Sequence, residues 1–261
     1  MRIVKHLILD VTGSTNDAVR SILDSIAQGQ ALALMAYDQV SGRGQKGRSW
    51  YSTPHQSLLM SLGIRDLKIE KAGLFALHAY LAAKVAEFWR TALNAPVALK
   101  WPNDLYWKGL KLGGMLMEAS SRPPHQTDVV WGLGVNLNQE SFPSFLPHAV
   151  SAFQISGKSW HVETVFFHIC QVLEEALGKW ASLSEEEALN VYLEKLDGIS
   201  KVFEYRHLRS GHTFIARLSE ILPDGRAIFI LEDGSRAGPF RHDELERLLS
   251  PCNFQISSGE I

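Results

Sequence analysis

A segment rich in glycines and cations occupies residues 41–50, with the sequence SGRGQKGRSW. Its three glycines can adopt positive φ angles and let a ligand approach backbone N–H groups closely. Successive amides in such turns form a concave site for anions, and Arg43, Lys46 and Arg48 add positive charge there. A solvated basic turn is the alternative, because short motifs of this kind often occur by chance. We expect the segment to bind a polyanion.

A second polar turn follows an apolar stretch at Val97-Ala98-Leu99-Lys100-Trp101-Pro102-Asn103-Asp104. Asparagine and aspartate after proline are common in ordinary turns, which is the alternative to a functional role for Asn103 and Asp104. Lys111 lies seven residues further on, ahead of Gly113-Gly114 and an apolar strand. Glycines inside a strand often mark a place where another group packs against bare backbone. This pattern predicts a cation ahead of an apolar strand on whose bare backbone another group packs.

Two more glycines, Gly132 and Gly134, alternate with apolar residues in the run Val129–Asn136. One face of that strand therefore lacks side chains at two positions. A flat ligand could lie there, and a close strand or helix contact would explain the same pattern.

Polar residues also stand at the ends of two N-terminal elements. Ser14, Thr15 and Asn16 are N-cap residue types and precede a helical apolar pattern, so simple capping is one explanation for them. Gln39 follows a small apolar strand and enters the 41–50 segment. A buried glutamine amide offers donors and an acceptor, which suit a ligand's urea or amide group as well as a turn.

Hydrophobic periodicity predicts the elements that hold these segments in place. Strands are expected over residues 3–9, 31–37, 57–64, 111–118 and 129–136, with a further strand running from 97 into the polar turn. Helices are expected over 70–94, 161–183 and 185–196, with a short one through Val19 and Ile26. His78, beside the apolar stripe of the 70–94 helix, is expected to be a packed histidine because no partner lies at metal-ligand spacing.

Past Gly198 the sequence changes to short β-prone runs, 213–218, 227–231 and 236–240. Pro223-Asp224-Gly225 and Asp233-Gly234 separate these runs, and Asp-Gly between strands is a strong hairpin signal. We expect a second, small all-β domain built as a five-stranded barrel.

Composition bounds the class of protein. The 261 residues are 46% hydrophobic and 21% charged, which is ordinary for a globular chain. A net charge of −2 argues against a dedicated nucleic-acid binder. Cys170 and Cys252 lie far apart without metal spacing, and there is no leader-like or membrane-length apolar run, so we expect a cytoplasmic protein.

The segments SGRGQKGRSW, KWPNDLYWKGLKLGGMLME and VVWGLGVNLN, with STN ahead of them, resemble the biotin protein ligases in order and spacing. The resemblance runs from about Ser14 to Asn138 and points to the short form without an N-terminal DNA-binding domain. It implies an α+β fold in which helices flank a mixed β-sheet, as in the class II aminoacyl-tRNA synthetases and the lipoate ligases. The expected division is a catalytic domain at residues 1–198 and an SH3-like β-barrel at 199–261.

The resemblance implies that biotin and MgATP form biotinyl-5′-AMP, after which a lysine of a carrier domain takes up biotin. It gives catalytic roles to Lys111, which would lie between two anions, and to Arg43. The residues implied in biotin binding are Ser14, Thr15, Asn16, Gln39, Gly42, Arg43, Lys111, Gly114, Gly132 and Gly134. Those implied in ATP binding are Arg48, Trp50, Asn103, Asp104 and Asn136, and the metal contacts stay open. The expected partner is the biotin carboxyl carrier protein of a carboxylase of the acetyl-CoA type, without DNA or membrane, and a homodimer is possible.

Two alternatives and one departure accompany this interpretation. A lipoate or octanoate ligase shares the fold, but its arginine-rich RRxSGG-type segment is absent from this sequence. A biotin-binding regulator without ligase activity would not need a cation facing phosphate. Gln45 stands where many relatives carry a third arginine, which predicts looser retention of the adenylate.

Overall fold

The computed structural model describes residues 1–69, 73–122, 126–199 and 201–251. Its larger part is a seven-stranded sheet in the order β1-β2-β3-β7-β6-β5-β4. β1 runs parallel to β2, and the other neighbours are antiparallel, so the sheet is mixed. The strands are β1 (Ile3–Thr12), β2 (Ala31–Gln39), β3 (Ser57–Leu67), β4 (Ala98–Lys100), β5 (Asp104–Trp107), β6 (Leu110–Arg122) and β7 (Gln126–Asn136). The expected strands are confirmed; β5, only four residues long, is too short to show a period of its own.

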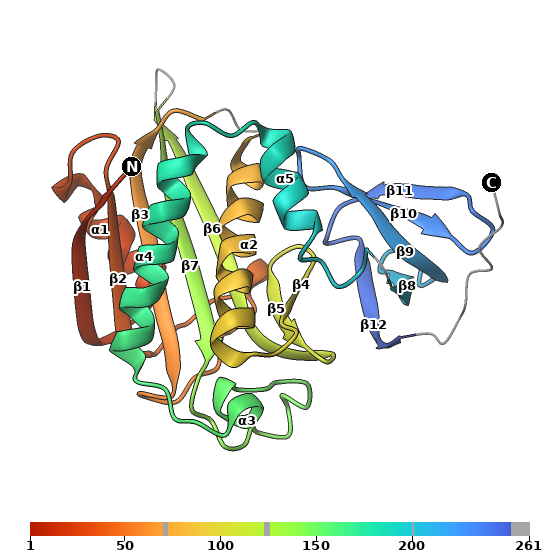
Figure 1. Cartoon of the computed structure of the whole chain (residues 1–261), viewed down its shortest axis with the longest axis horizontal. Helices are drawn as coiled ribbons and strands as arrows, with labels where there is room; N and C mark the ends of the chain where they lie inside the picture. The colour runs from red at the N-terminus through yellow and green to blue at the C-terminus, as the bar shows by residue number, and fades with distance from the viewer. Residues whose placement is uncertain (70–72, 123–125, 200, 252–261) are drawn as a thin grey trace.

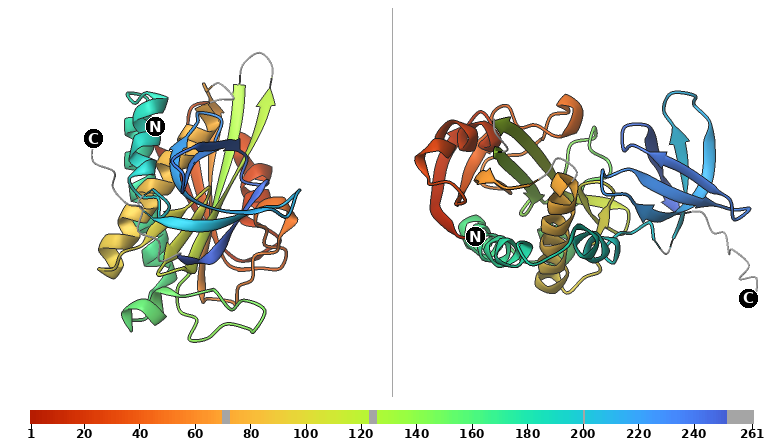
Figure 2. Two further views of the ribbon diagram at one scale, coloured as in Figure 1. Left: turned by 90° about the vertical axis from the view of Figure 1, so that its right-hand side faces the viewer. Right: turned by 90° about the horizontal axis from the view of Figure 1, so that it is seen from above.

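Helices cover both faces of this sheet (Figures 1 and 2). α2 (Gly73–Leu93), α4 (Val162–Trp180) and α5 (Glu185–Leu193) form a row on one face, and the shorter α1 (Thr15–Ile22) packs on the other. Two 3-10 turns, η1 (Leu23–Ser25) and η2 (Gln45–Gly47), lie in the N-terminal part. The predicted helices are confirmed, except that residues 70–72 of the first lie outside the described residues.

A short helix, α3 (Ala152–Ser156), was not expected in the connection after β7. Five residues are too few for a recognisable apolar period, and local hydrogen bonds fix its start instead. The Ser151 side chain accepts from the backbone N–H of Gln154, and the Gln154 side chain accepts from the Ser151 N–H. This reciprocal arrangement is a capping box.

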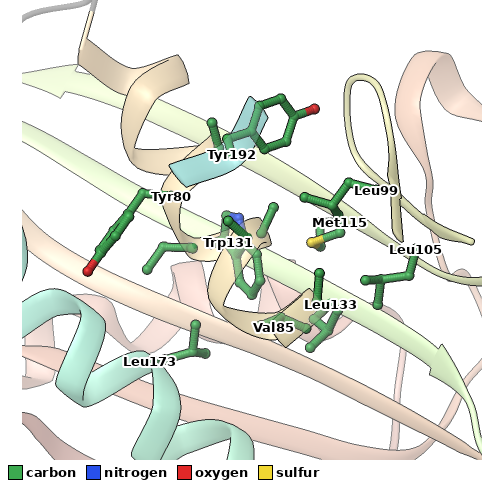
Figure 3. Packing of buried hydrophobic residues seen from close by; sticks show 14 of the residues in the cluster. Tyr80, Val85, Leu99, Leu105, Met115, Trp131, Leu133, Leu173 and Tyr192 are labelled. Atoms are coloured by element: carbon green, nitrogen blue, oxygen red, sulfur yellow. The ribbon is translucent and has the colours of Figure 1, made fainter. Parts of the chain in front are cut away.

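Alternation along β7 separates the two faces of the sheet. Trp131, Leu133 and Val135 are buried in the core beneath α2, α4 and α5, together with Tyr80, Val85, Leu173 and Tyr192 (Figure 3). Val130 joins a smaller apolar cluster with Val19, Leu23 and Leu34 on the α1 face. The larger core therefore lies on the face away from Gly132 and Gly134.

His78 lies in that core, as expected of a packed residue. The indole N–H of Trp131 donates to His78 Nδ1 at 3.1 Å, and only 6% of the histidine is exposed. Burial lowers the pKa of His78 from 6.5 to about 4. The folded protein thus keeps this ring neutral at a pH where the unfolded chain binds a proton.

Acid should therefore destabilise the protein partly through His78. Between pH 6.5 and 4 the unfolded state binds the proton first, so the unfolding free energy should fall by about 3 kcal/mol as pH is lowered. Urea unfolding at pH 7 and pH 4.5 measures this loss. His78→Gln should show a smaller loss than the wild type, and His168→Gln, at an exposed position of α4, is the matched control substitution. Equal losses in wild type and His78→Gln would contradict the assignment.

The C-terminal part forms a five-stranded antiparallel sheet in the order β11-β10-β9-β8-β12, at the right of Figure 1. Its strands are β8 (Val202–His207), β9 (Thr213–Ile221), β10 (Ala227–Leu231), β11 (Arg236–Phe240) and β12 (Leu245–Pro251). The three expected β runs and both glycine turns are confirmed, with φ of 84° at Gly225 and 81° at Gly234. This sheet is consistent with the expected SH3-like unit. A domain boundary at residue 198 stays a prediction.

Side chains join the two sheets. The Trp101 indole N–H donates to the Gly225 carbonyl at 3.1 Å, and the Arg247 guanidinium lies 3.2 Å from the Asp197 carboxylate. Cys170 is a buried free thiol of α4, and Cys252 lies outside the described residues. No helix within the described ranges is long and apolar enough to cross a membrane.

Candidate active site

A cavity of about 290 Å³ lies on the α1 face of the large sheet. Every predicted site residue except Gly42 lines it: Ser14, Thr15, Asn16, Gln39, Arg43, Arg48, Trp50, Asn103, Asp104, Lys111, Gly114, Gly132, Gly134 and Asn136. They come from α1, β2, the 41–50 segment, the β4–β5 turn, β6 and β7. The fold thus brings together segments that are up to about 120 residues apart in the chain.

Gly42 lies just behind the cavity wall. A Cβ there would come within 3.0 Å of the Trp50 carbonyl oxygen and 3.1 Å of Gln39 Nε2. The Trp50 N–H donates to the Gly42 carbonyl at 2.9 Å, so this glycine lets the 41–50 segment close back on itself.

The glycines of β6 and β7 form the bare backbone that the sequence predicted. A Cβ on Gly134 would come within 2.6 Å of the Trp50 indole, and one on Gly132 would collide with the Asn16 amide. At Gly114 the nearest atoms would be Asp104 Oδ1 at 3.1 Å and Lys111 Nζ at 3.3 Å. The close contact that explains these glycines is therefore with polar and aromatic side chains of the cavity.

The start of α1 is held by hydrogen bonds to other elements and not by its own N-cap side chain. Ser14 occupies the N-cap position, yet its side chain makes no capping hydrogen bond. The Thr15 N–H and hydroxyl donate to Gln39 Oε1 at 2.7 and 3.0 Å. Ser61 Oγ lies 2.6 Å from Asn16 Oδ1 and 2.8 Å from Thr15 Oγ1. Simple capping does not account for these residues, which together build one wall of the cavity.

Lys111 stands at the start of β6 with its ammonium group directed into the site. Lys111 Nζ lies 2.8 Å from Asp104 Oδ1 and 5.7 Å from the centroid of the Trp50 ring. The lysine side chain is 35% exposed and that of the aspartate 20%, so a ligand can reach both. The buried indole Nε1 of Trp50 has no hydrogen-bond partner in the described part of the chain. Lys111 is therefore a donor available to an anion, and the buried Trp50 N–H is a further donor near it.

The two asparagines of the predicted nucleotide group also stabilise the cavity walls. Asn103 Nδ2 donates to the Met115 carbonyl of β6, and Asn136 Nδ2 donates to the Val150 carbonyl at 3.1 Å. Both side chains are buried. Their amide donors hold the turn and the loop before α3 in place.

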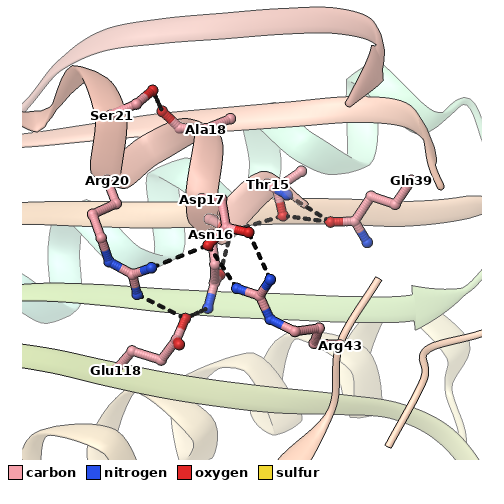
Figure 4. A network of polar contacts seen from close by, with 10 residues as sticks. Thr15, Asn16, Asp17, Ala18, Arg20, Ser21, Gln39, Arg43 and Glu118 are labelled. Atoms are coloured by element: carbon pink, nitrogen blue, oxygen red, sulfur yellow. Dashed lines mark hydrogen bonds and ion pairs between the residues drawn. The ribbon is translucent and has the colours of Figure 1, made fainter. Parts of the chain in front are cut away.

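An ionic network, which the sequence did not indicate, surrounds the start of α1 (Figure 4). Arg43 pairs with Asp17 through both terminal nitrogens at 2.6 Å, and Arg20 lies 3.0 Å from the same carboxylate. Glu118 on β6 contacts Arg20 at 3.1 Å and accepts from Asn16 at 2.6 Å. Hydrogen bonding by Arg43, reinforced by Arg20, lowers the pKa of Asp17.

A second cavity, about 480 Å³, continues from the first past Arg48, Asn103 and Asp104 toward the C-terminal sheet. Lys100 and Arg247 line it. Burial and the neighbouring Arg247 lower the pKa of Lys100 to about 8. Arg247 is largely buried, and its Nε has no hydrogen-bond partner in the described ranges. This cavity therefore has a basic wall, of which Arg247 was not predicted.

Comparison with known proteins gives a consistent result. Residues 8–136 match the Biotin/lipoate A/B protein ligase family. The bifunctional ligase/repressor BirA of Bacillus spizizenii is 32% identical over 66% of this chain and 53% of its own. The biotin--[acetyl-CoA-carboxylase] ligase of Mycobacterium tuberculosis is 30% identical over 68% of this chain and 65% of its own. The chain thus spans between half and two thirds of the length of these curated relatives.

The fold is also that of a solved ligase. The biotin protein ligase from Aquifex aeolicus in complex with biotin and ATP superposes with a TM-score of 0.69, at 24% identity, over 96% of both chains. This likeness confirms the expected α+β fold with its mixed, helix-flanked sheet. The sequence matches show that residues 8–136 belong to the biotin/lipoate A/B protein ligase family, and the likeness in fold agrees with this assignment.

Proposed function

We propose that this protein is a biotin protein ligase, which activates biotin with ATP and passes it to a lysine of a carrier domain. The observation that carries the proposal is the position of Lys111. Its ammonium group lies in the glycine-floored cavity, 2.8 Å from Asp104, which lines both that cavity and the basic one. The matched relatives named as biotin ligases support the choice of substrate.

In the first step, the biotin carboxylate would attack the α-phosphorus of ATP, and the bond to the β-phosphate would break to release pyrophosphate. The attack brings two anions together, so a fixed cation between them stabilises the transition state. Lys111 would supply that cation and Arg43 would add charge from the 41–50 segment. In the second step, a carrier lysine would attack the carbonyl of the mixed anhydride and release AMP.

Biotin would occupy the cavity beside Gln39, Thr15 and Asn16, whose amide and hydroxyl groups suit a ureido ring. The nucleotide would lie toward Arg48, Trp50 and Asp104, with the pyrophosphate portion in the basic second cavity. The 41–50 segment, closed over the cavity, would exclude water, which otherwise hydrolyses the anhydride.

Asp104 fits the Mg²⁺ that ATP brings. Within the described ranges, no group of three His, Cys, Asp or Glu residues could hold a metal ion. Magnesium in nucleotide sites commonly uses one or two carboxylates together with substrate phosphates, so a single carboxylate is sufficient. Asp104 is the carboxylate that lines both cavities.

The proposed acceptor is the biotin carboxyl carrier protein of an acetyl-CoA carboxylase-type enzyme, because two matched relatives are named as ligases for that carboxylase. A homodimer and a cytoplasmic location remain predictions.

Pyrophosphate release from ATP tests the proposal directly. It should depend on biotin, and lipoate or octanoate at the same concentration should give only the background rate. Lys111→Ala should abolish the biotin-dependent rate. Release driven by lipoate would transfer the proposal to the lipoate branch of the family, and binding of biotin without release would favour a regulator.

Because of Gln45, we expect the site to release biotinyl-AMP more readily than a site with arginine at this position. Gln45 lines both cavities at the position where many relatives carry arginine, and its amide is uncharged. Gln45→Arg would add a charge-assisted hydrogen bond to the adenylate, which should lengthen the half-life of bound biotinyl-AMP about fivefold. Rapid filtration of the preloaded enzyme measures that half-life. Equal half-lives in both proteins would refute the prediction.

A further inference from the structure

We propose that Asp17 is a positioning residue that holds Arg43, and with it the 41–50 segment, over the cavity. The pair is bidentate: Arg43 Nη1 and Nη2 each lie 2.6 Å from one oxygen of the Asp17 carboxylate (Figure 4). A fork-to-carboxylate contact fixes the orientation of both groups as well as their distance. The catalytic consequence rests on the function proposed above, in which this segment covers an adenylate.

Asp17 can act as an anchor because its own helix is fixed. It lies in the first turn of α1, next to Thr15 and Asn16, which hydrogen-bond to β2 and β6. Val19, two residues further on, is fully buried. A carboxylate on such a base moves little, so a partner held by it is also held relative to the sheet.

The 41–50 segment can transmit that restraint because it folds as one small unit. Arg43 and Ser49 form a β-bridge, and the Gly44 N–H donates to the Arg48 carbonyl at 2.6 Å. At its base the Ser41 N–H donates to the Gly13 carbonyl at 2.9 Å. The Asp17 contact lies nearer the tip, where it restrains opening of the segment about that base.

Arg20 keeps the Asp17 carboxylate in place from its other side. It contacts Asp17 at 3.0 Å and Glu118 at 3.1 Å, so the carboxylate lies between two guanidinium groups. These contacts connect the 41–50 segment through α1 to β6, the strand that carries Lys111. A displacement of Asp17 would therefore loosen Arg43 without removing any group of the cavity itself.

The expected effect of losing the Asp17–Arg43 pair is limited by the solvent exposure of the two side chains. The Arg43 and Asp17 side chains are 39% and 48% exposed, and ion pairs of this kind contribute up to about 1 kcal/mol. Loss of the pair should thus shift the closed-to-open ratio of the segment by up to about fivefold. At 1 M salt the difference should shrink, because exposed charges are screened over about 3 Å.

The first measurement needs no ligase activity. Limited trypsin digestion cuts after Arg43, Lys46 and Arg48, and mass spectrometry follows each cut. Asp17→Asn should speed cleavage in this segment about three- to fivefold at low salt. Asp17→Glu, which keeps the charge, should restore part of the protection. Asp24→Asn makes the same charge change in η1, where the carboxylate contacts Arg65 at 3.3 Å, and should match the wild type.

The second measurement follows biotin and ATP. Asp17→Asn should release biotinyl-AMP into solution about three- to fivefold faster, while the single-turnover rate of pyrophosphate release at saturating substrates should change less than this, because Lys111 stays in place. In an Arg43→Gln background, where trypsin can cut this segment only after Lys46 and Arg48, the same change should have no further effect on cleavage at those sites or on release, because the partner is gone.

Unchanged cleavage in a folded Asp17→Asn protein, judged by its thermal melting, would overturn the positioning role. If the wild-type protein forms no adenylate but Asp17→Asn still speeds cleavage, the positioning role stands and the proposed function is rejected. Faster cleavage that persists in the Arg43→Gln background would also overturn the inference, because Asp17 would then act through another group.

Discussion

Replacing Lys111 by methionine is expected to lower biotin-dependent pyrophosphate release at least a hundredfold while the protein stays folded. The ammonium group lies in the first cavity, 2.8 Å from Oδ1 of Asp104, which lines both cavities. Removing a preorganised charge of this kind costs about 3 kcal/mol of transition-state stabilisation. The substitution also leaves Asp104 without this cation, which adds repulsion toward an incoming carboxylate or phosphate.

Single-turnover formation of biotinyl-AMP measures this step without interference from product release. Lys108→Met is the matched control, because it removes an exposed cation from the β5–β6 turn, where Lys108 lies 4.8 Å from the Trp107 ring centroid. The control should keep the wild-type rate. A Lys111→Met enzyme within fivefold of wild type would show that the charge at this position does not drive the reaction.

Gly134→Ala is expected to reduce kcat/KM for biotin by one to two orders of magnitude, roughly 1.4–3 kcal/mol. The added Cβ would lie 2.6 Å from the Trp50 indole, so the ring must shift. The shift moves the indole N–H and disturbs the ring beside Lys111. Because the changed atoms lie on the cavity face, away from the larger core, the melting temperature should fall by only a few degrees.

Steady-state kinetics together with thermal unfolding separates these two effects. Gly178→Ala in α4 provides the control, since a Cβ there meets nothing within 4 Å. In a helix that change should stabilise the protein slightly and leave kcat/KM unchanged. Wild-type kinetics for Gly134→Ala would mean that Trp50 can move without consequence for the site.

The parts of the fold that sequence could predict are those with a long hydrophobic period. α2 and the central strands carry many apolar residues, so their type and approximate ends were evident. β5 and α3 have four and five residues, and pairing with β6 or a capping box decides their structure. Such contacts have no local periodic signal.

The site divides in the same way. The glycines and polar turns follow one another along the chain as in the biotin protein ligases, and this order indicated the floor of the cavity and the place of Lys111. The network of Asp17, Arg20 and Glu118 could not be predicted, because Glu118 is about a hundred residues away in an apolar strand and pairs with α1 only after β6 is placed. Arg247 was missed for a similar reason, since only the docked C-terminal sheet brings it beside Lys100.

The two-residue alternation along β7 has a consequence for how this protein can change. Trp131, Leu133 and Val135 pack in the larger core, while Gly132, Gly134 and Asn136 face the cavity. We therefore expect neighbouring codons of this strand to be under different selection, one set mainly for folding and the other for ligand. We expect that core residues outside the cavity lining, such as Trp131 and Val135, can be exchanged to raise or lower thermal tolerance while the binding surface keeps its shape.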